Sequence, residues 1–238
     1  DMVIDYGLHW EEARQFDLGL DFRALNNRLT LEFDYYIKTT ANILTNITLP
    51  GISGSTYSPL SNIAKARNTG IEFNIGWREN RGDFSYDLSL IGTTLKNKVV
   101  SVNQNLPPLE NGANVTKVGY PIGGFWGYEV LGIYQNKQII EETASIDGAT
   151  PGDLWYKDQN GDGVIDKDDR IYMGSYLPKV TLGLNMRFAY KGVDLEMDLY
   201  SSLGNKIYST RRQTLGVSPY NVTTDYLHSW VGEGSTNK

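Results

Sequence analysis

Residues 180–199 read VTLGLNMRFAYKGVDLEMDL, a stretch in which apolar and polar side chains alternate on both sides of a short break. Successive side chains of a β-strand point to opposite faces, so this period of two predicts two strands, each with one apolar and one polar face. Lys191-Gly192 supplies the tight turn between them. The stretch is therefore a predicted β-hairpin.

Two more hairpins precede it. Residues 16–24 and 29–38 alternate in the same way around a predicted two-residue turn at Asn26-Asn27, and residues 71–77 and 84–90 do so around Asn-Arg-Gly-Asp at 80–83. Long Gly-, Pro-, Asn- and Ser-rich connections, at about 42–63, 100–176 and from 204 onward, strictly alternate with these short turns. The predicted strands run to roughly 12 to 15 residues, beyond the 5 or 6 usual in soluble sheets.

Short turns at one end and long loops at the other are typical of outer-membrane barrels, in which about 9 to 11 residues cross the membrane. The pattern favours an all-β fold, an antiparallel transmembrane β-barrel segment, over a soluble two-sheet sandwich. Leu, Phe, Ile, Val and Met would then contact lipid. A wet lumen would receive the charged side chains of Glu32, Asp34, Glu72, Asp87, Arg187, Asp194, Glu196 and Asp198. Aromatic girdles at the interfaces would contain Tyr35, Tyr36, Trp77, Phe84, Tyr86, Phe188 and Tyr190.

Composition excludes several classes. The chain has 238 residues, no cysteine and a net charge of -6, which disfavours a nucleic-acid surface and rules out a disulfide framework. Its apolar runs are too short for a transmembrane helix.

His9 and His228 are the only histidines and lie at opposite ends, so neither a zinc cluster nor a catalytic triad is indicated. We expect no enzyme. Because the chain starts at Asp1, we expect a piece of a longer polypeptide.

Residues 158–169 read DQNGDGVIDKDD, which has the spacing of a calcium-binding loop. The oxygen donors would be the side chains of Asp158, Asn160, Asp162, Asp166 and Asp169 and the carbonyl of Val164. Gly163 permits the sharp reversal, and Ile165 would anchor the loop. Neither flank is helical, so a structural Ca²⁺ that stiffens β-structure is expected rather than a sensor. The alternative is an Asp/Asn/Gly-rich turn that holds no metal.

The long connection at 100–176 is rich in aromatic side chains. Such residues could stack on sugar rings or grip a partner, or they could pack within the loop. The candidates for substrate or partner binding are Tyr120, Phe125, Trp126, Tyr128, Trp155 and Tyr156.

Several separated segments resemble one known family. They read WEEARQFDLGLDF at 10–22, LTLEFDYYIKTT at 29–40, ARNTGIEF at 66–73, GYPIGGFWGYEVLGIYQ at 119–135, DLWYKDQNGDGVIDKDDRIYMGSYLPK at 153–179 and YKGVDL at 190–195. Together, in this order and over nearly the whole chain, they resemble the C-terminal barrel region of the SusC/RagA family of TonB-dependent outer-membrane receptors.

The resemblance implies about six strands of a barrel of about 22, with an N-terminal plug and the final strands lying outside residues 1–238. It implies an importer in the outer membrane of a Gram-negative bacterium that takes up oligosaccharides or peptides. Its partners would be a SusD-like surface lipoprotein and TonB, the latter through the missing N-terminal region. The residues themselves leave one alternative, a soluble, calcium-stabilised β-domain that binds carbohydrate. In that case the apolar side chains would fill a closed core instead of facing lipid.

Overall fold

The computed structural model describes residues 7–47, 59–103, 109–209 and 224–237. They belong to two compact units. Unit 1 comprises the described parts of 1–124 and 174–206, and unit 2 those of 125–173 and 207–238.

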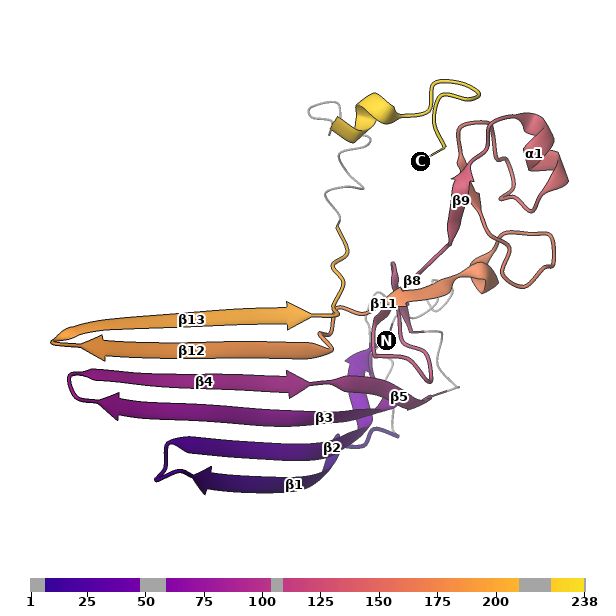
Figure 1. Cartoon of the computed structure of the whole chain (residues 1–238). Helices are drawn as coiled ribbons and strands as arrows, with labels where there is room; N and C mark the ends of the chain where they lie inside the picture. Colours follow the sequence, from indigo (N-terminus) through magenta and orange to yellow (C-terminus); the bar gives the residue numbers. More distant parts are fainter. Residues whose placement is uncertain (1–6, 48–58, 104–108, 210–223, 238) are drawn as a thin grey trace. The chain divides into compact units, whose positions relative to one another are not determined.

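Unit 1 is built on one antiparallel sheet. Its long strands are neighbours in the order β1-β2-β3-β4-β12-β13, so the three predicted hairpins lie side by side (Figure 1). A further strand, β5, pairs with the outer part of β3. The bounds are β1 Glu12–Ala24, β2 Leu29–Asn46, β3 Leu60–Arg81, β4 Phe84–Thr94, β5 Lys96–Val102, β12 Val180–Tyr190 and β13 Val193–Leu203. The predicted all-β, antiparallel architecture is confirmed.

The three short turns differ in how well they were predicted. Tyr190 pairs with Val193, which leaves Lys191-Gly192 as the two-residue turn that the sequence predicts, with φ of 47° and 84°. The first turn was predicted too short, because Ala24 pairs with Leu29 and residues 25–28 connect them. The second was predicted too long, because Arg81 pairs with Phe84 and only Gly82-Asp83 connect them.

At the other end of the sheet the strands reach further than predicted. β2 has 18 residues and β3 has 22, and they pair out to Asn46 and Leu60. The first long connection therefore covers 47–59 instead of 42–63. The second starts after Val102 and not at residue 100, because β5 extends the sheet.

The apolar face of this sheet is exposed. Leu20 on β1 is 67% exposed, Val193 on β13 is 71% exposed and Leu199 is 58% exposed. In the described part of unit 1, no second sheet covers these side chains, which contradicts the soluble-sandwich alternative. Buried apolar side chains of unit 1, such as Ile63 and Val99, lie on the outer parts of β3 and β5.

A band of this apolar face contains no charged residue. On β3, the outward-facing positions from Thr69 to Trp77 are uncharged, with Arg67 at one side and Glu79 at the other. These residues cover about 30 Å of strand, which a tilt of about 40° projects onto about 23 Å of membrane thickness. This height matches the apolar band of about 25 Å on outer-membrane barrels.

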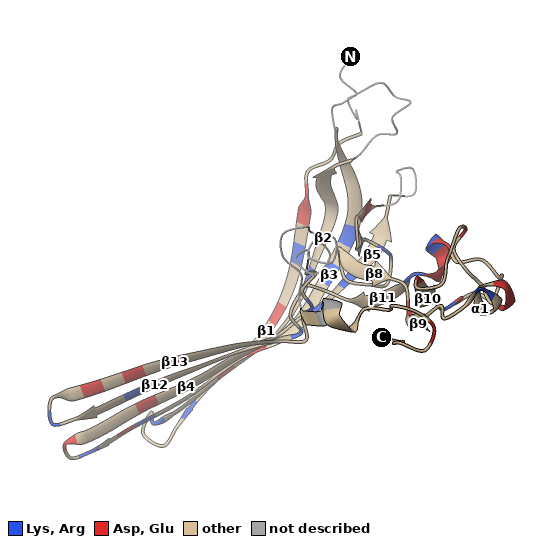
Figure 2. Cartoon of the chain, turned by 90° about the horizontal axis from the view of Figure 1, so that it is seen from above, with Lys and Arg blue, Asp and Glu red and all other residues tan. Residues whose placement is uncertain are grey.

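The opposite face is polar, as predicted. Neighbouring strands pair their charged and amide side chains across it: Asn74 Nδ2 donates to Glu32 Oε2 at 3.0 Å, and an Arg187 Nη donates to Glu196 Oε1 at 2.9 Å. On β4, β12 and β13 the charged residues lie in the half of each strand next to the turns (Figure 2). The eight side chains predicted to face a lumen share this face by register.

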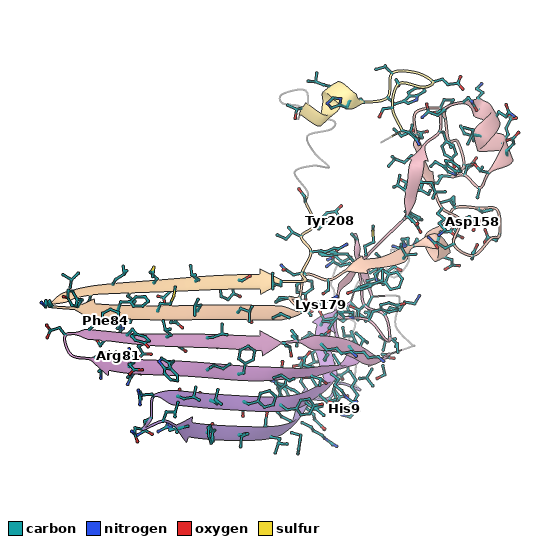
Figure 3. The ribbon with its side chains drawn as sticks, viewed as in Figure 1. His9, Arg81, Phe84, Asp158, Lys179 and Tyr208 are labelled. Atoms are coloured by element: carbon teal, nitrogen blue, oxygen red, sulfur yellow. The ribbon has the colours of Figure 1, made fainter. Side chains whose placement is uncertain are left out.

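Aromatic residues gather at the turn end of the apolar face. Trp77 Nε1 donates to the Tyr86 hydroxyl at 3.3 Å, and the Phe84 and Tyr86 rings are 5.8 Å apart. Phe188 and Tyr190 pair with Tyr86 and Phe84 from the next strand. Figure 3 shows Phe84 beside the turn. The predicted girdle is wrong at Tyr36, which lies on the polar face opposite Asp17 and donates to the Thr94 carbonyl at 3.3 Å.

Unit 2, which contains most of the long connection predicted at 100–176, has short helices and strands of its own. β9 pairs with β10, and β8 pairs with β11. Its buried side chains include Tyr134, Ile133, Ile165 and Asp169. The bounds are β8 Gly124–Gly127, β9 Val130–Ile133, α1 Lys137–Glu142, β10 Leu154–Tyr156, η2 Lys167–Asp169, β11 Ile171–Gly174 and η3 Thr224–His228, while β6 Glu110–Asn111 and β7 Asn114–Val115 belong to unit 1. In the described ranges, no helix has the length and apolarity to cross a membrane.

Candidate functional site

The loop at 158–169 lies between two short strands, β10 and β11, as predicted from its non-helical flanks. Ile165 is only 6% exposed, so it anchors the loop in the core of unit 2 in the role expected of it. An isolated bridge joins Val164 to Ser145. Figure 3 shows Asp158 at the start of the loop.

The acidic side chains of the first half hold the loop's own backbone. Asp158 accepts hydrogen bonds from the N–H groups of Gly161, at 2.6 Å, and Gly163, at 2.9 Å. Asp162 accepts from the N–H of Val164 at 2.9 Å. Gly161 and Gly163 have φ of 78° and 85°, values that favour glycine, so the tight reversal depends on them.

Asp169 closes the second half. Its carboxylate is fully buried and accepts from the N–H groups of Asp166 and Gln159, both at 2.8 Å. These two backbone hydrogen bonds hold the pKa of Asp169 below its usual value. Asp166 in turn accepts from the N–H of Asp168 at 2.7 Å and caps η2. The last residue of the loop is thus a buried, ionised carboxylate.

The donor set is chemically suited to a hard divalent cation, since it consists of carboxylate, amide and carbonyl oxygens. Each carboxylate oxygen that accepts one N–H retains further acceptor capacity. Within the described residues, however, no three Asp, Glu, His or Cys side chains converge into a ready metal centre. Binding of Ca²⁺ therefore stays a prediction, and so does the metal-free turn.

The six aromatic candidates do not form one platform. Five lie in unit 2, while Tyr120 belongs to unit 1. Tyr128 and Tyr156 have ring centroids 5.1 Å apart, Trp126 meets Tyr172 edge to face, Phe125 lies near Tyr208, and Trp155 stacks on Tyr134. Burial raises the pKa of Tyr156. These pairs are consistent with the packing role that the sequence left open, and binding of substrate or partner remains a prediction.

The loop is tied to its surroundings by contacts that the sequence did not reveal. Glu129 accepts from Gln159 Nε2 at 2.8 Å and from Lys157 Nζ at 3.3 Å, and these two hydrogen bonds lower the pKa of Glu129. Gln159 occupies a non-ligand position of the loop, so the calcium-loop pattern gives it no role. No local pattern marks the partnership, since about thirty residues separate the two side chains.

Residues 230–237 also hold unit 2 together, through contacts that the sequence did not reveal. Gln135 accepts from Trp230 Nε1 and from the N–H of Gly234, and Asn237 accepts from the N–H of Ile133. Gly152 has no room for a side chain because Trp230 packs against it. Residues 230–237 therefore form part of unit 2.

Comparison with known proteins gives one consistent family. The family model described as TonB dependent receptor-like, beta-barrel matches residues 2–205. TonB-dependent receptor P3 of Formosa agariphila is 34% identical over 234 residues, with 94% of this chain and 23% of that protein covered. TonB-dependent receptor SusC of Bacteroides thetaiotaomicron is 27% identical, with 84% of this chain and 20% of that protein covered.

Solved structures agree on the fold. The structure of the RagAB peptide transporter has a TM-score of 0.76 at 23% identity and covers 95% of this chain and 25% of the matched one. The RagAB peptide importer in the closed-closed state has a TM-score of 0.65 at 25% identity, with coverage of 83% and 22%. The chain thus spans only about a fifth to a quarter of the length of the proteins that it matches.

Proposed function

This chain belongs to the family of TonB-dependent receptor β-barrels, of the SusC/RagA type, and from that premise we propose that it is the lipid-facing wall of an outer-membrane importer. The importer is the whole polypeptide, of which residues 1–238 supply six adjacent barrel strands and a second folded unit. The cell is a Gram-negative bacterium.

The exposed apolar face carries this proposal. Monomeric soluble proteins rarely leave a contiguous apolar patch of more than a few hundred Å² in water. Here Phe16, Leu20, Leu195 and Leu199, from the first and last strands, are each more than half exposed. Acyl chains are the environment in which such a face is stable, and the wet, charged opposite face suits a lumen.

The remaining parts of the proposal rest on the relatives. One of them is named SusC, and the matched structures are of a peptide transporter called RagAB. We therefore assign the whole receptor two partners, a SusD-like surface lipoprotein on the outside and TonB on the periplasmic side. Its substrates are oligosaccharides or peptides that the receptor takes up actively.

We further propose that the 158–169 loop binds one structural Ca²⁺. The ligands are the side chains of Asp158, Asn160, Asp162, Asp166 and Asp169 with the Val164 carbonyl. A bound Ca²⁺ would offset two of the four negative charges of these ligand carboxylates and link them within one short loop, and so stiffen unit 2. Ile165 and Asp169, both buried, connect the loop to the core that would be stiffened.

The import function is tested with the full-length receptor in its own host. Outer-membrane fractions are probed for the receptor, and uptake of mixed radiolabelled oligosaccharides and peptides is compared between the wild type and a receptor-gene deletion. We expect receptor-dependent uptake that an uncoupler of the proton gradient abolishes. A receptor found in the soluble fraction, or uptake that the deletion leaves unchanged, would refute the proposal.

A further inference from the structure

One set of cross-strand partners on the lumen face is not polar. Ile91 on β4 pairs with Gly183 on β12, which pairs with Tyr200 on β13. Tyr200 is 77% exposed and Ile91 is 45% exposed, although their face elsewhere carries hydrogen-bonded charged pairs. Between them lies a hollow of about 350 Å³ with Gly183 at its floor. This volume is at the lower end of the range for ligand sites and fits one ring-sized group.

Gly183 differs from the other glycines of the six long strands. A Cβ on Gly70 or Gly92 would clash with the Thr94 carbonyl oxygen or the Phe73 ring, and a Cβ on Gly19 or Gly76 would meet the Asp34 carboxylate or the Thr30 hydroxyl, so each of those four has a close neighbour. A Cβ on Gly183 would meet nothing nearer than the Leu199 carbonyl oxygen at 4.0 Å, and its φ is not positive. Neither packing nor backbone conformation requires glycine here. A glycine within a strand also marks places where a ligand approaches the backbone closely.

The rim of the hollow is polar. Asn185 and Asp198 form the neighbouring cross-strand pair, with Asn185 Nδ2 donating to Asp198 Oδ1 at 2.5 Å. Thr93 and Thr181 line the other side. The exposed aromatic ring and the open floor suit a ligand ring with an apolar face. The flanking amide, carboxylate and hydroxyl groups suit hydroxyls around the edge of that ring.

The position and charge of the hollow narrow the choice of ligand. Tyr200 lies three residues from Leu203, at the strand end opposite the Lys191-Gly192 turn, so the hollow is on the side of the long connections. β13 presents Asp194, Glu196 and Asp198 to the same face, which disfavours anionic ligands. We propose that this hollow is a subsite for one ring of a neutral oligosaccharide, stacked on Tyr200 over Gly183; the proposal rests on the import function proposed above.

Direct binding tests this inference. The purified full-length receptor in detergent is applied to an array of neutral oligosaccharides, and the best-bound one is titrated against the variants. Tyr200→Ala is expected to weaken binding about tenfold, while Tyr200→Phe keeps the ring and stays close to wild type. Gly183→Leu fills the hollow and is expected to abolish binding. Leu195→Ala, on the same strand but the lipid face, is the matched control and should bind as the wild type does.

Folding is checked separately for each variant by heat-modifiable mobility on gels. If Gly183→Leu fails to fold, Gly183→Ala, which has room for its methyl group, takes its place with a smaller expected loss. Unchanged affinity in the Tyr200→Ala and Gly183 variants overturns the subsite while leaving the import function standing. A wild-type receptor that binds no oligosaccharide on the array but binds a random peptide library also overturns it.

Accessibility gives an independent readout. The chain has no cysteine, so Thr181→Cys places a single thiol of residues 1–238 beside the hollow. A membrane-impermeant maleimide applied to intact cells is expected to label it, and the bound oligosaccharide is expected to slow the labelling. A thiol that stays unreactive with and without the sugar would show that another protein segment covers the hollow, and the proposal would be wrong.

Discussion

The backbone N–H of Gln159 donates to Oδ1 of Asp169 at 2.8 Å, which ties the second residue of the 158–169 loop to its last. The other oxygen of the same carboxylate accepts from Asp166, so one buried side chain closes both halves of the loop. This arrangement needs two acceptor oxygens and no donor at position 169.

Asp169→Asn is therefore expected to loosen the loop although it preserves the size of the side chain. An amide offers one acceptor and one NH₂ group, so one of the two backbone N–H groups would face another donor. Limited proteolysis of the full-length receptor should show faster cleavage within residues 150–176. The exposed neighbour provides the control, because Asp168→Asn should be cleaved as slowly as wild type.

The tie between Glu129 and the loop is expected to depend on pH. Hydrogen bonds from Gln159 and Lys157 lower the pKa of Glu129 in the folded state. Their stabilising contribution is complete above the ordinary Glu pKa of about 4.3 and is lost as the pH falls through the lowered folded-state pKa. We expect amide exchange at 157–160 to be slower in wild type than in Glu129→Gln at neutral pH, with the difference vanishing in acid. Equal rates at neutral pH would contradict this.

Calcium binding has its own test. If the loop holds Ca²⁺, then EGTA should accelerate proteolysis of residues 150–176 in the full-length receptor, and added Ca²⁺ should restore protection. Asp162→Ala, which removes a proposed ligand, should be cleaved rapidly with or without chelator. Cleavage rates that are insensitive to both chelator and Ca²⁺ would mean that the loop is a metal-free turn.

On the lipid face, the space for a side chain at residue 92 is restricted. Phe73 on β3 lies over Gly92 on β4, and a Cβ at residue 92 would clash with its ring. Gly92→Val should displace the ring and destabilise the barrel by about 1–3 kcal/mol. The readout is the temperature at which the full-length receptor loses its heat-modifiable mobility. Gly183→Ala, whose methyl group has room, should not lower that temperature.

The sheet could be predicted because the alternation of apolar and polar side chains is a local feature of the sequence. A period of two assigns each strand residue to a face, and the register across six strands keeps those faces aligned. The same rule shows why Tyr36 was assigned wrongly: it follows Tyr35 directly, and consecutive strand residues cannot share a face. Turn lengths were less predictable. Leu25 adopts a φ of 56°, which is unusual for its residue type and lengthens the first turn.

Unit 2 was not predictable in the same way. Its organisation depends on contacts between distant residues, such as Gln135 with Trp230 and Ile133 with Asn237, about one hundred positions apart. No periodic sequence pattern predicts such pairs. The Asp158–Asp169 loop was visible because one short motif contains all of its donors, whereas the Glu129 tie depends on how two strands bring separate segments together.

The central claim is that the apolar face contacts acyl chains, and tryptophan quenching tests it most directly. Single substitutions Leu195→Trp and Glu196→Trp place the probe on adjacent residues of β13 that face opposite sides of the sheet. The full-length receptor is reconstituted with lipids brominated on the acyl chains, and the added fluorescence of each variant over wild type is measured. We predict that the bromines strongly quench the probe at 195 and leave the probe at 196 nearly unquenched. Equal quenching at both positions, or none at 195, would contradict the account.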